Sequence, residues 1–163
     1  MQHIHEDYFR SAMFGLQDGL VSTTGVVVGV STGVEDKAII ILASLVTVTV
    51  EATSMAAGQY SSEKAVHQMD KSGKHTDSLL LGAIIMFLAY FMAGMIPIIP
   101  TILLPQPSAR FVAILAALTG LFTIGFIKGH LVNSKPLRSA VELAVIGGIA
   151  TSIGLIVGYF LKI

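Results

Sequence analysis

The fold class is decided by the stretch LLLGAIIMFLAYFMAGMIPIIPTILL, residues 79–104. It holds no charged residue, and it is longer than the roughly 20 apolar residues that a helix needs to cross a bilayer. Pro97 and Pro100 lie near its end, where we expect a kink or an unwound turn because each proline removes a backbone donor. The stretch predicts a transmembrane helix.

The rest of the chain has the same character, with 53% hydrophobic and only 12% charged residues, against about 25% charged in a typical soluble domain. Four further apolar stretches are long enough to span a membrane. We therefore predict an all-α, polytopic integral membrane protein with one domain, residues 1–163. Its five expected spans are 10–33, 37–62, 79–104, 109–129 and 137–161, with a polar cytoplasmic loop at 63–78.

The positive charges predict the orientation. Seven of the 10 Lys and Arg residues fall on one side of a five-span chain: Arg10, Lys64, Lys71, Lys74, Lys128, Lys135 and Arg138. Because cytoplasmic loops carry the excess of Lys and Arg, the N-terminus and the 63–78 loop should be cytoplasmic and the C-terminus outside. One chain of this size is too small to enclose a pathway, so a two-fold homodimer is the economical expectation.

Small residues recur at helical spacing in the first span. Gly25, Gly29 and Gly33 follow one another every four residues, a spacing that lets helix backbones approach closely. We predict a helix–helix contact there, although glycine is also common in membrane helices without such a role.

Three acidic residues lie inside apolar stretches: Asp18, Glu51 and Glu142. Glu142 can pair with Arg138 near a span end and is read as structural. Asp18 and Glu51 have no such partner nearby in the sequence, and a charge at membrane depth costs about 2.5–3.5 kcal/mol on insertion scales. Such residues usually face a pathway or a partner, so these two are candidate functional groups.

Depth places these acids near a methionine. The first two spans are antiparallel, so Asp18 and Met55 should both lie about 12 Å below the cytoplasmic surface, with Glu51 one turn deeper. Positions four apart share a helix face, which puts Glu51 and Met55 on one stripe. The same stripe continues outwards as a cytoplasmic entrance formed by Gln59, Glu63, His67 and Asp70.

This set of ligands favours a divalent metal. Carboxylates suit hard cations, and a thioether shifts the preference towards transition metals such as Fe²⁺. Protons and metal ions would compete for the same oxygens, which is the physical basis of metal–proton exchange. Two other readings stay open: Met55 could be helix packing, and Glu51 could pair with a residue across a helix interface.

Four motifs resemble the vacuolar iron transporter family. They are FGLQDGLVSTTGVVVGV (14–30), ATSMAAGQYSSE (52–63), MAGMIPIIPTIL (92–103) and LRSAVELAVIGGIATSIGLIVGYFL (137–161). The resemblance implies a five-span dimer that exports Fe²⁺, and often Mn²⁺, from the cytosol in exchange for protons. It also implies a pathway at the dimer interface, lined by the first two spans, in which Asp18 and Met55 match the motif positions.

The sequence departs from that family at two places. Gln59 stands where the family motif has an acid, and the 63–78 loop stands where many members carry a cytoplasmic metal-binding domain. These departures keep two alternatives open, a non-transporting membrane scaffold of the same fold and a passive divalent-cation channel.

The remaining expectations are mostly negative. The sequence has no nucleophile–base pair or cofactor motif, so neither an enzyme nor a cofactor is expected, and Fe²⁺ or Mn²⁺ would be substrate. A net charge of zero gives no reason to expect a nucleic-acid partner; the expected partners are the lipid bilayer, a second copy of the chain, metal ions and protons. We expect a prokaryotic plasma membrane from the small size and the lack of a targeting segment.

Overall fold

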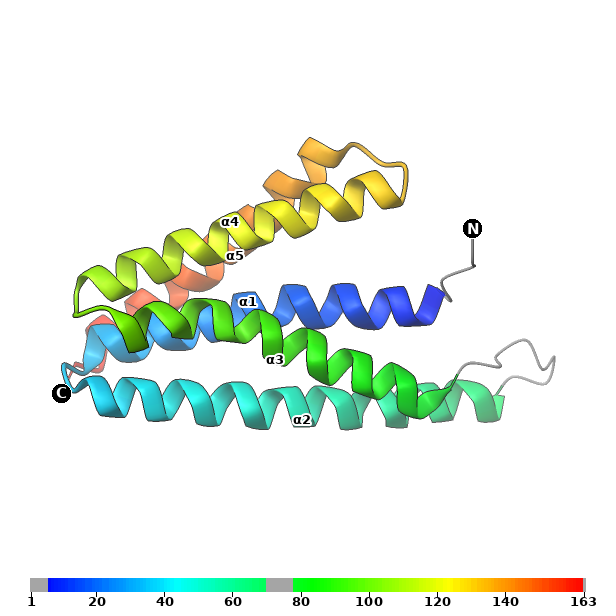
Figure 1. The fold of residues 1–163 in the computed structure, drawn as a ribbon, viewed down its shortest axis with the longest axis horizontal. Helices are drawn as coiled ribbons and strands as arrows, with labels where there is room; N and C mark the ends of the chain where they lie inside the picture. Colours follow the sequence, from blue (N-terminus) through cyan, green and yellow to red (C-terminus); the bar gives the residue numbers. More distant parts are fainter. Residues whose placement is uncertain (1–5, 70–77, 163) are drawn as a thin grey trace.

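The computed structural model describes residues 6–69 and 78–162, which form five helices (Figure 1). They are α1 (Glu6–Gly33), α2 (Lys37–Met69), α3 (Leu79–Leu103), α4 (Ser108–Leu131) and α5 (Pro136–Phe160). Each of the five is long and apolar enough to cross a bilayer. The predicted all-α membrane fold is therefore confirmed.

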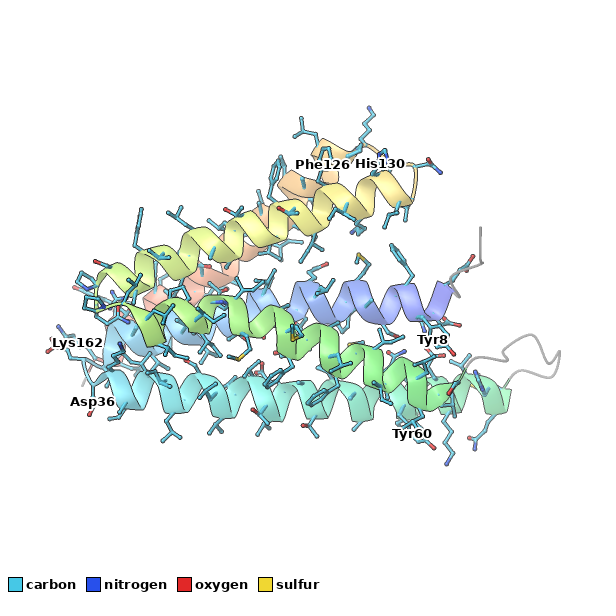
Figure 2. All side chains as sticks on the ribbon, viewed as in Figure 1. Tyr8, Asp36, Tyr60, Phe126, His130 and Lys162 are labelled. Atoms are coloured by element: carbon cyan, nitrogen blue, oxygen red, sulfur yellow. The ribbon has the colours of Figure 1, made fainter. Side chains whose placement is uncertain are left out.

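Successive helices run in opposite directions along the length of the bundle (Figure 1). Figure 2 shows Tyr8 and His130 towards one end of the molecule and Asp36 and Lys162 at the other. We call these the N-side and the C-side. The start of α1, the end of α2 and the α4–α5 connection lie on the N-side, and the end of α5 lies on the C-side.

Helix α1 is the centre of the bundle, because it contacts each of the other four helices. Helix α2 contacts only α1 and α3 among the described helices. Its buried apolar and small residues recur every four positions: Ile40, Ser44, Val48 and Ala52. The opposite face of α2 exposes Leu42, Val46 and Val50, which suits contact with lipid rather than with water.

The glycines of the first span pack against α5 of the same chain. The carbonyl oxygen of Gly154 lies 3.1 Å from where a Cβ on Gly29 would stand, and the carbonyl of Gly158 lies at the same distance from a Cβ on Gly33. A Cβ on Gly154 would collide with the carbonyl of Gly25. The glycine stripes of α1 and α5 thus allow the two backbones to approach closely.

Lysine and arginine side chains bind the carbonyl groups at helix ends on the C-side. The Nζ atom of Lys37 donates to the carbonyl oxygens of Ile102 at 2.8 Å and Leu104 at 3.3 Å. The Nε atom of Arg110 donates to Ser31 Oγ at 3.0 Å, and its guanidinium also donates to the Ser31 carbonyl. These cations satisfy carbonyls at the ends of α3 and α1 and oppose the negative ends of the helix dipoles.

The helix ends add detail to two sequence expectations. Helix α3 is helical through Pro97 and Pro100 and ends at Leu103, so of the expected kink or unwound turn the structure excludes the unwound turn. Helix α2 continues to Met69, so the first residues of the predicted 63–78 connection are helical. The extension is stabilised by Glu63, which is only 6% exposed and pairs with Arg10 of α1.

Candidate functional site

The candidate site begins with a stripe of polar residues on α2. Thr47, Glu51, Met55 and Gln59 are half-buried and follow one another every four residues on one unbroken helix. The geometry of the helix therefore gives them the common face that the sequence predicts. The face turns towards α1 and α3, the two helices that α2 contacts.

The Glu51 carboxylate is held by hydroxyl groups from two other helices. Ser22 of α1 donates to Glu51 Oε2 at 3.1 Å, and the Tyr90 hydroxyl of α3 donates to the same oxygen. The hydroxyl oxygens of Ser22 and Tyr90 also lie within hydrogen-bonding distance of each other, and because each hydroxyl has a single hydrogen, a bond between them replaces one of the two bonds to Glu51. Because Tyr90 is only 1% exposed, this cluster joins three helices inside the bundle and orients the carboxylate.

Asp18 lies one helical turn before Ser22 on α1 and is half-buried. The charges of its carboxylate and of Glu51 are close enough to act on each other. Asp18 makes no side-chain hydrogen bond or ion pair within residues 6–69 and 78–162. Asp18 thus lies one turn from Ser22, which hydrogen-bonds to Glu51, and neither acid has a basic partner in the described part of the chain. Two such acids on neighbouring membrane-spanning helices favour a bound cation or a shared proton.

Met55 has an apolar environment. It packs against a cluster of buried residues that includes Val48, Ala52 and Tyr90. These contacts agree with the alternative left open in the sequence analysis, namely that Met55 serves helix packing. Its role as a metal ligand stays a prediction, as do the metal-binding roles of Asp18 and Glu51.

One described chain does not supply a full set of ligands. Among residues 6–69 and 78–162, no three His, Cys, Asp or Glu side chains come together in a way that could hold a metal ion. Divalent cations take four to eight ligands in proteins. Any site built on Asp18 and Glu51 therefore needs backbone groups, water or a second copy of the chain to complete it.

An ion pair lies among the residues of the expected entrance. The Arg10 guanidinium binds Glu63 Oε1 and also lies 3.1 Å from Asp7 Oδ1. Gln59 donates to the same Glu63 oxygen at 3.2 Å. The cavity lined by Asp7, Gln59 and Glu63 has a volume of only about 10 Å³, about enough for a single water.

Two further residues were predicted at the entrance. His67 is half-buried and lines the same small cavity. Asp70 lies outside the described residues.

The ion pair expected between Arg138 and Glu142 is absent: both side chains are exposed, and neither makes an ion pair in the described part of the chain.

Sequence reasoning missed three groups at the site: Ser22, Tyr90 and Arg10. Ser22 stands four residues after Asp18, so the helix period that organised α2 could have identified it on α1. Tyr90 is the one tyrosine in the apolar stretch 79–104, and a buried hydroxyl there needs a hydrogen-bond partner. The partner of Arg10 has no signal in the sequence, since Glu63 lies in a different helix.

Comparison with known proteins assigns the chain to a family. The model of the VIT family matches residues 9–81 and 65–159. The chain belongs to the VIT family. The VIT-family motifs recognised in the sequence lie on α1, α2, α3 and α5, and they include Asp18 and Met55.

Relatives within the VIT family are named as transporters. Vacuolar iron transporter 1 of Arabidopsis thaliana is 43% identical over 74 residues, which cover 45% of this chain and 30% of the relative. Vacuolar iron transporter 1 of Eucalyptus grandis is 34% identical over the same shares of the two chains. Vacuolar iron transporter homolog 4 of Arabidopsis thaliana is 26% identical over 158 residues, 90% of this chain and 80% of the relative.

The matches differ in how much of each relative they cover. The match spans only about 30% of the length of the two proteins named vacuolar iron transporter 1 but most of homolog 4. The names are those of transporters or of their homologs. They refer to the vacuole, so they give no support to the expected prokaryotic plasma membrane. Integral membrane location follows from the five apolar helices and the family.

Proposed function

We propose that this protein is a membrane carrier that moves Fe²⁺ or Mn²⁺ out of the cytosol in exchange for protons. The observation that carries the proposal is that two acids of adjacent apolar helices, Asp18 on α1 and Glu51 on α2, are half-buried and have no basic partner among the described residues. Buried acids without a basic partner mark ion or proton pathways in membrane proteins. The transporter names of the relatives support the same reading.

Exchange follows from the chemistry of this pair. A divalent ion binds best when both carboxylates are ionised, whereas protonation of either one removes an anionic ligand and releases the ion. The hydroxyls of Ser22 and Tyr90 occupy Oε2 of Glu51, which leaves Oε1 for the metal or the proton. One binding centre can therefore hold an ion or protons in turn, as antiport requires.

The proposal includes a homodimer. A single chain offers two acids at this depth, and two copies related by a two-fold axis would offer four. Thioether ligands from Met55 would add to these if the side chain left its apolar cluster. Transport by a dimer and a complete metal site thus belong to the same proposal.

Metal flux into proteoliposomes tests the function directly. The full chain is reconstituted with a metal indicator and a pH dye inside the vesicles, and Mn²⁺ is added outside under an imposed pH gradient. We expect saturable Mn²⁺ uptake with opposite proton movement. Asp18→Asn and Glu51→Gln should each lower the uptake at least about tenfold, because each removes an anionic ligand.

The matched control is Glu35→Gln, which removes an exposed carboxylate in the α1–α2 connection. This variant should transport like the wild type. Saturable flux that persists in both Asp18→Asn and Glu51→Gln would reject the carboxylate pathway. Metal flux without proton movement would favour a passive channel, and the lack of any saturable flux would favour a scaffold.

A further inference from the structure

A cationic cavity lies at the N-side end of α4 and α5, away from the acidic pair. Its volume is about 490 Å³. The side chains that line it come from the end of α4, the connection and the first turns of α5: Lys128, Ser134, Lys135, Arg138, Ser139 and Glu142. Three cations and one carboxylate give the cavity an excess of positive charge.

A tight turn at the end of α4 forms one side of this cavity. Helix α4 ends at Leu131, and Asn133 just after it lies in the left-handed region at φ 51°, a conformation that asparagine tolerates better than most residues. Asn133 N–H donates to the His130 carbonyl at 3.3 Å, and Ser134 N–H donates to the Gly129 carbonyl at 2.9 Å. This pair of bonds is a Schellman motif, and it turns the chain directly into α5.

A glycine lets the two helices meet there. A Cβ on Gly129 would stand 2.6 Å from the Cα atom of Pro136, closer than real atoms approach. Only glycine therefore allows the start of α5 to lie against the last turn of α4. That contact brings Lys128 of α4 to the same cavity as Lys135 and Arg138 of α5.

The start of α5 offers backbone donors to the cavity. Lys135 is the N-cap residue and provides no side-chain cap. Pro136 has no N–H, and the N–H groups of Leu137 and Arg138 have no acceptor among the described residues. The helix dipole adds partial positive charge at the same place, so a negative group is favoured there.

Ser139 lies beside the cavity, in the contact between α5 and α4. It is only 7% exposed, and its Cβ atom lies 3.2 Å from where a Cβ on Gly129 would stand. Its Oγ atom is buried and therefore does not present a donor to the cavity.

The three basic side chains of the cavity have no bonding partner among the described residues, unlike Lys37, Arg110 and Arg10. On the C-side, Lys37 and Arg110 are occupied by main-chain carbonyls. On the N-side, Arg10 pairs with Glu63. Within the described residues, none of the three cationic side chains of the cavity makes an ion pair or a side-chain hydrogen bond.

We infer that this cavity binds a phosphate group. A phosphate oxygen can accept from the free N–H groups at the start of α5, while the lysines and Arg138 oppose its charge. The cavity lies where two membrane-spanning helices end, at the level of lipid headgroups. The phosphate can belong to an anionic phospholipid or to a soluble phosphate compound, and both have the same recognition chemistry. The inference does not depend on the proposed transport function.

Lipid binding by the purified full-length chain tests the inference. Native mass spectrometry is carried out with equal amounts of phosphatidylglycerol and phosphatidylcholine, and we expect the protein to retain phosphatidylglycerol selectively. The double variant Lys135→Gln/Arg138→Gln should bind it about 25-fold more weakly, about fivefold for each charge removed near an anionic lipid. Both side chains are exposed, so folding should be preserved.

The matched control is Lys64→Gln/Lys162→Gln, which removes the same charge from two exposed side chains outside the cavity. It should keep the affinity of the wild type. Equal weakening in the two double variants would reject the site in favour of general electrostatic attraction, as would the lack of any preference for phosphatidylglycerol.

A second arm separates the two sources of phosphate. The thermal midpoint of the detergent-solubilised protein is measured with inorganic phosphate or glycerol 3-phosphate and, separately, with phosphatidylglycerol. If the soluble compounds raise the thermal midpoint of the wild type but not that of the double variant, the site is assigned to a soluble phosphate. A rise with the lipid alone assigns it to a headgroup. If neither ligand stabilises the wild type more than the double variant, the inference is wrong.

Discussion

At the scale of single residues, the central feature is a carboxylate that three helices share. Glu51 belongs to α2, and its Oε2 atom accepts from Ser22 of α1 and Tyr90 of α3. Hydrogen bonds to charged groups are stronger than neutral ones and fix the orientation of the acceptor. Tyr90 is therefore a positioning residue for Glu51, in a helix that holds no acid of its own.

Removal of the Tyr90 hydroxyl tests this role. Tyr90→Phe keeps the ring and its packing but loses one hydrogen bond to the carboxylate, worth about 1.5–3 kcal/mol. We expect the apparent KM for Mn²⁺ uptake in proteoliposomes to rise about tenfold, because the carboxylate is less well oriented for the ion. The helical content measured by circular dichroism should not change.

The matched control for that substitution is Tyr60→Phe. Tyr60 is exposed on α2 and makes no hydrogen bond in the described part of the chain, so its loss of a hydroxyl should leave uptake unchanged. A Tyr90→Phe protein with the KM of the wild type would show that the phenol serves only packing.

At the scale of elements, backbone contact between α1 and α5 holds the two halves of the bundle together. Glycines on each helix face the backbone of the other. In lipid, the hydrophobic effect does not drive helices together, because lipid tails are as apolar as the side chains. Close van der Waals packing of this kind is therefore a main source of helix association there. The polar contacts of Arg10 and Arg110 then secure opposite ends of α1 to α2 and α4.

The close approach makes a direct prediction. Gly154→Ala places a Cβ against the carbonyl of Gly25, and neither backbone can move without disturbing the interface. We expect a loss of about 1–3 kcal/mol in stability, typical of overpacking. The change should appear as a lower thermal midpoint by circular dichroism in one detergent.

Gly148→Ala is the matched control, in the same helix. A Cβ at Gly148 meets nothing within 4 Å, so alanine there should be neutral or stabilise α5 by up to about 1 kcal/mol. If both variants melt alike, the α1–α5 contact does not limit stability.

At the scale of the whole molecule, an odd number of spans puts the chain ends on opposite sides. The structure has this arrangement, with Tyr8 and His130 towards one end and Asp36 and Lys162 at the other (Figure 2). The excess of Lys and Arg on the N-side predicts that this side is cytoplasmic. Export from the cytosol, as proposed, then runs from the Arg10–Glu63 pair towards Lys37 and Arg110.

Cysteine labelling checks the orientation, because the chain has no cysteine of its own. Single variants His130→Cys and Lys162→Cys each place a thiol on an exposed residue. In intact cells, a membrane-impermeant maleimide should label Lys162→Cys and should reach His130→Cys only after the membrane is opened. The reverse pattern would overturn the predicted orientation and, with it, the direction of transport.

Sequence patterns predicted the elements and the acids but not their partners. The five apolar stretches gave five helices in the right order, and the four-residue period put Glu51 and Met55 on one face of α2. The convergence of Asp18 and Glu51 on a metal ion stays a prediction. Helix α2 continues past the predicted span to Met69, and the Arg10–Glu63 pair could not be predicted because it joins two helices far apart in sequence.

The sequence by itself thus determined that this protein is a five-helix membrane protein with two acids at depth, since hydropathy and helical period are local properties. Only the tertiary structure decided that Tyr90 holds Glu51, that the α1 glycines face α5, and that Lys128, Lys135 and Arg138 share one cavity. The physical reason is that lipid and protein interior are about equally apolar. Hydropathy shows that a helix lies in the membrane, but not which of its faces meets another helix.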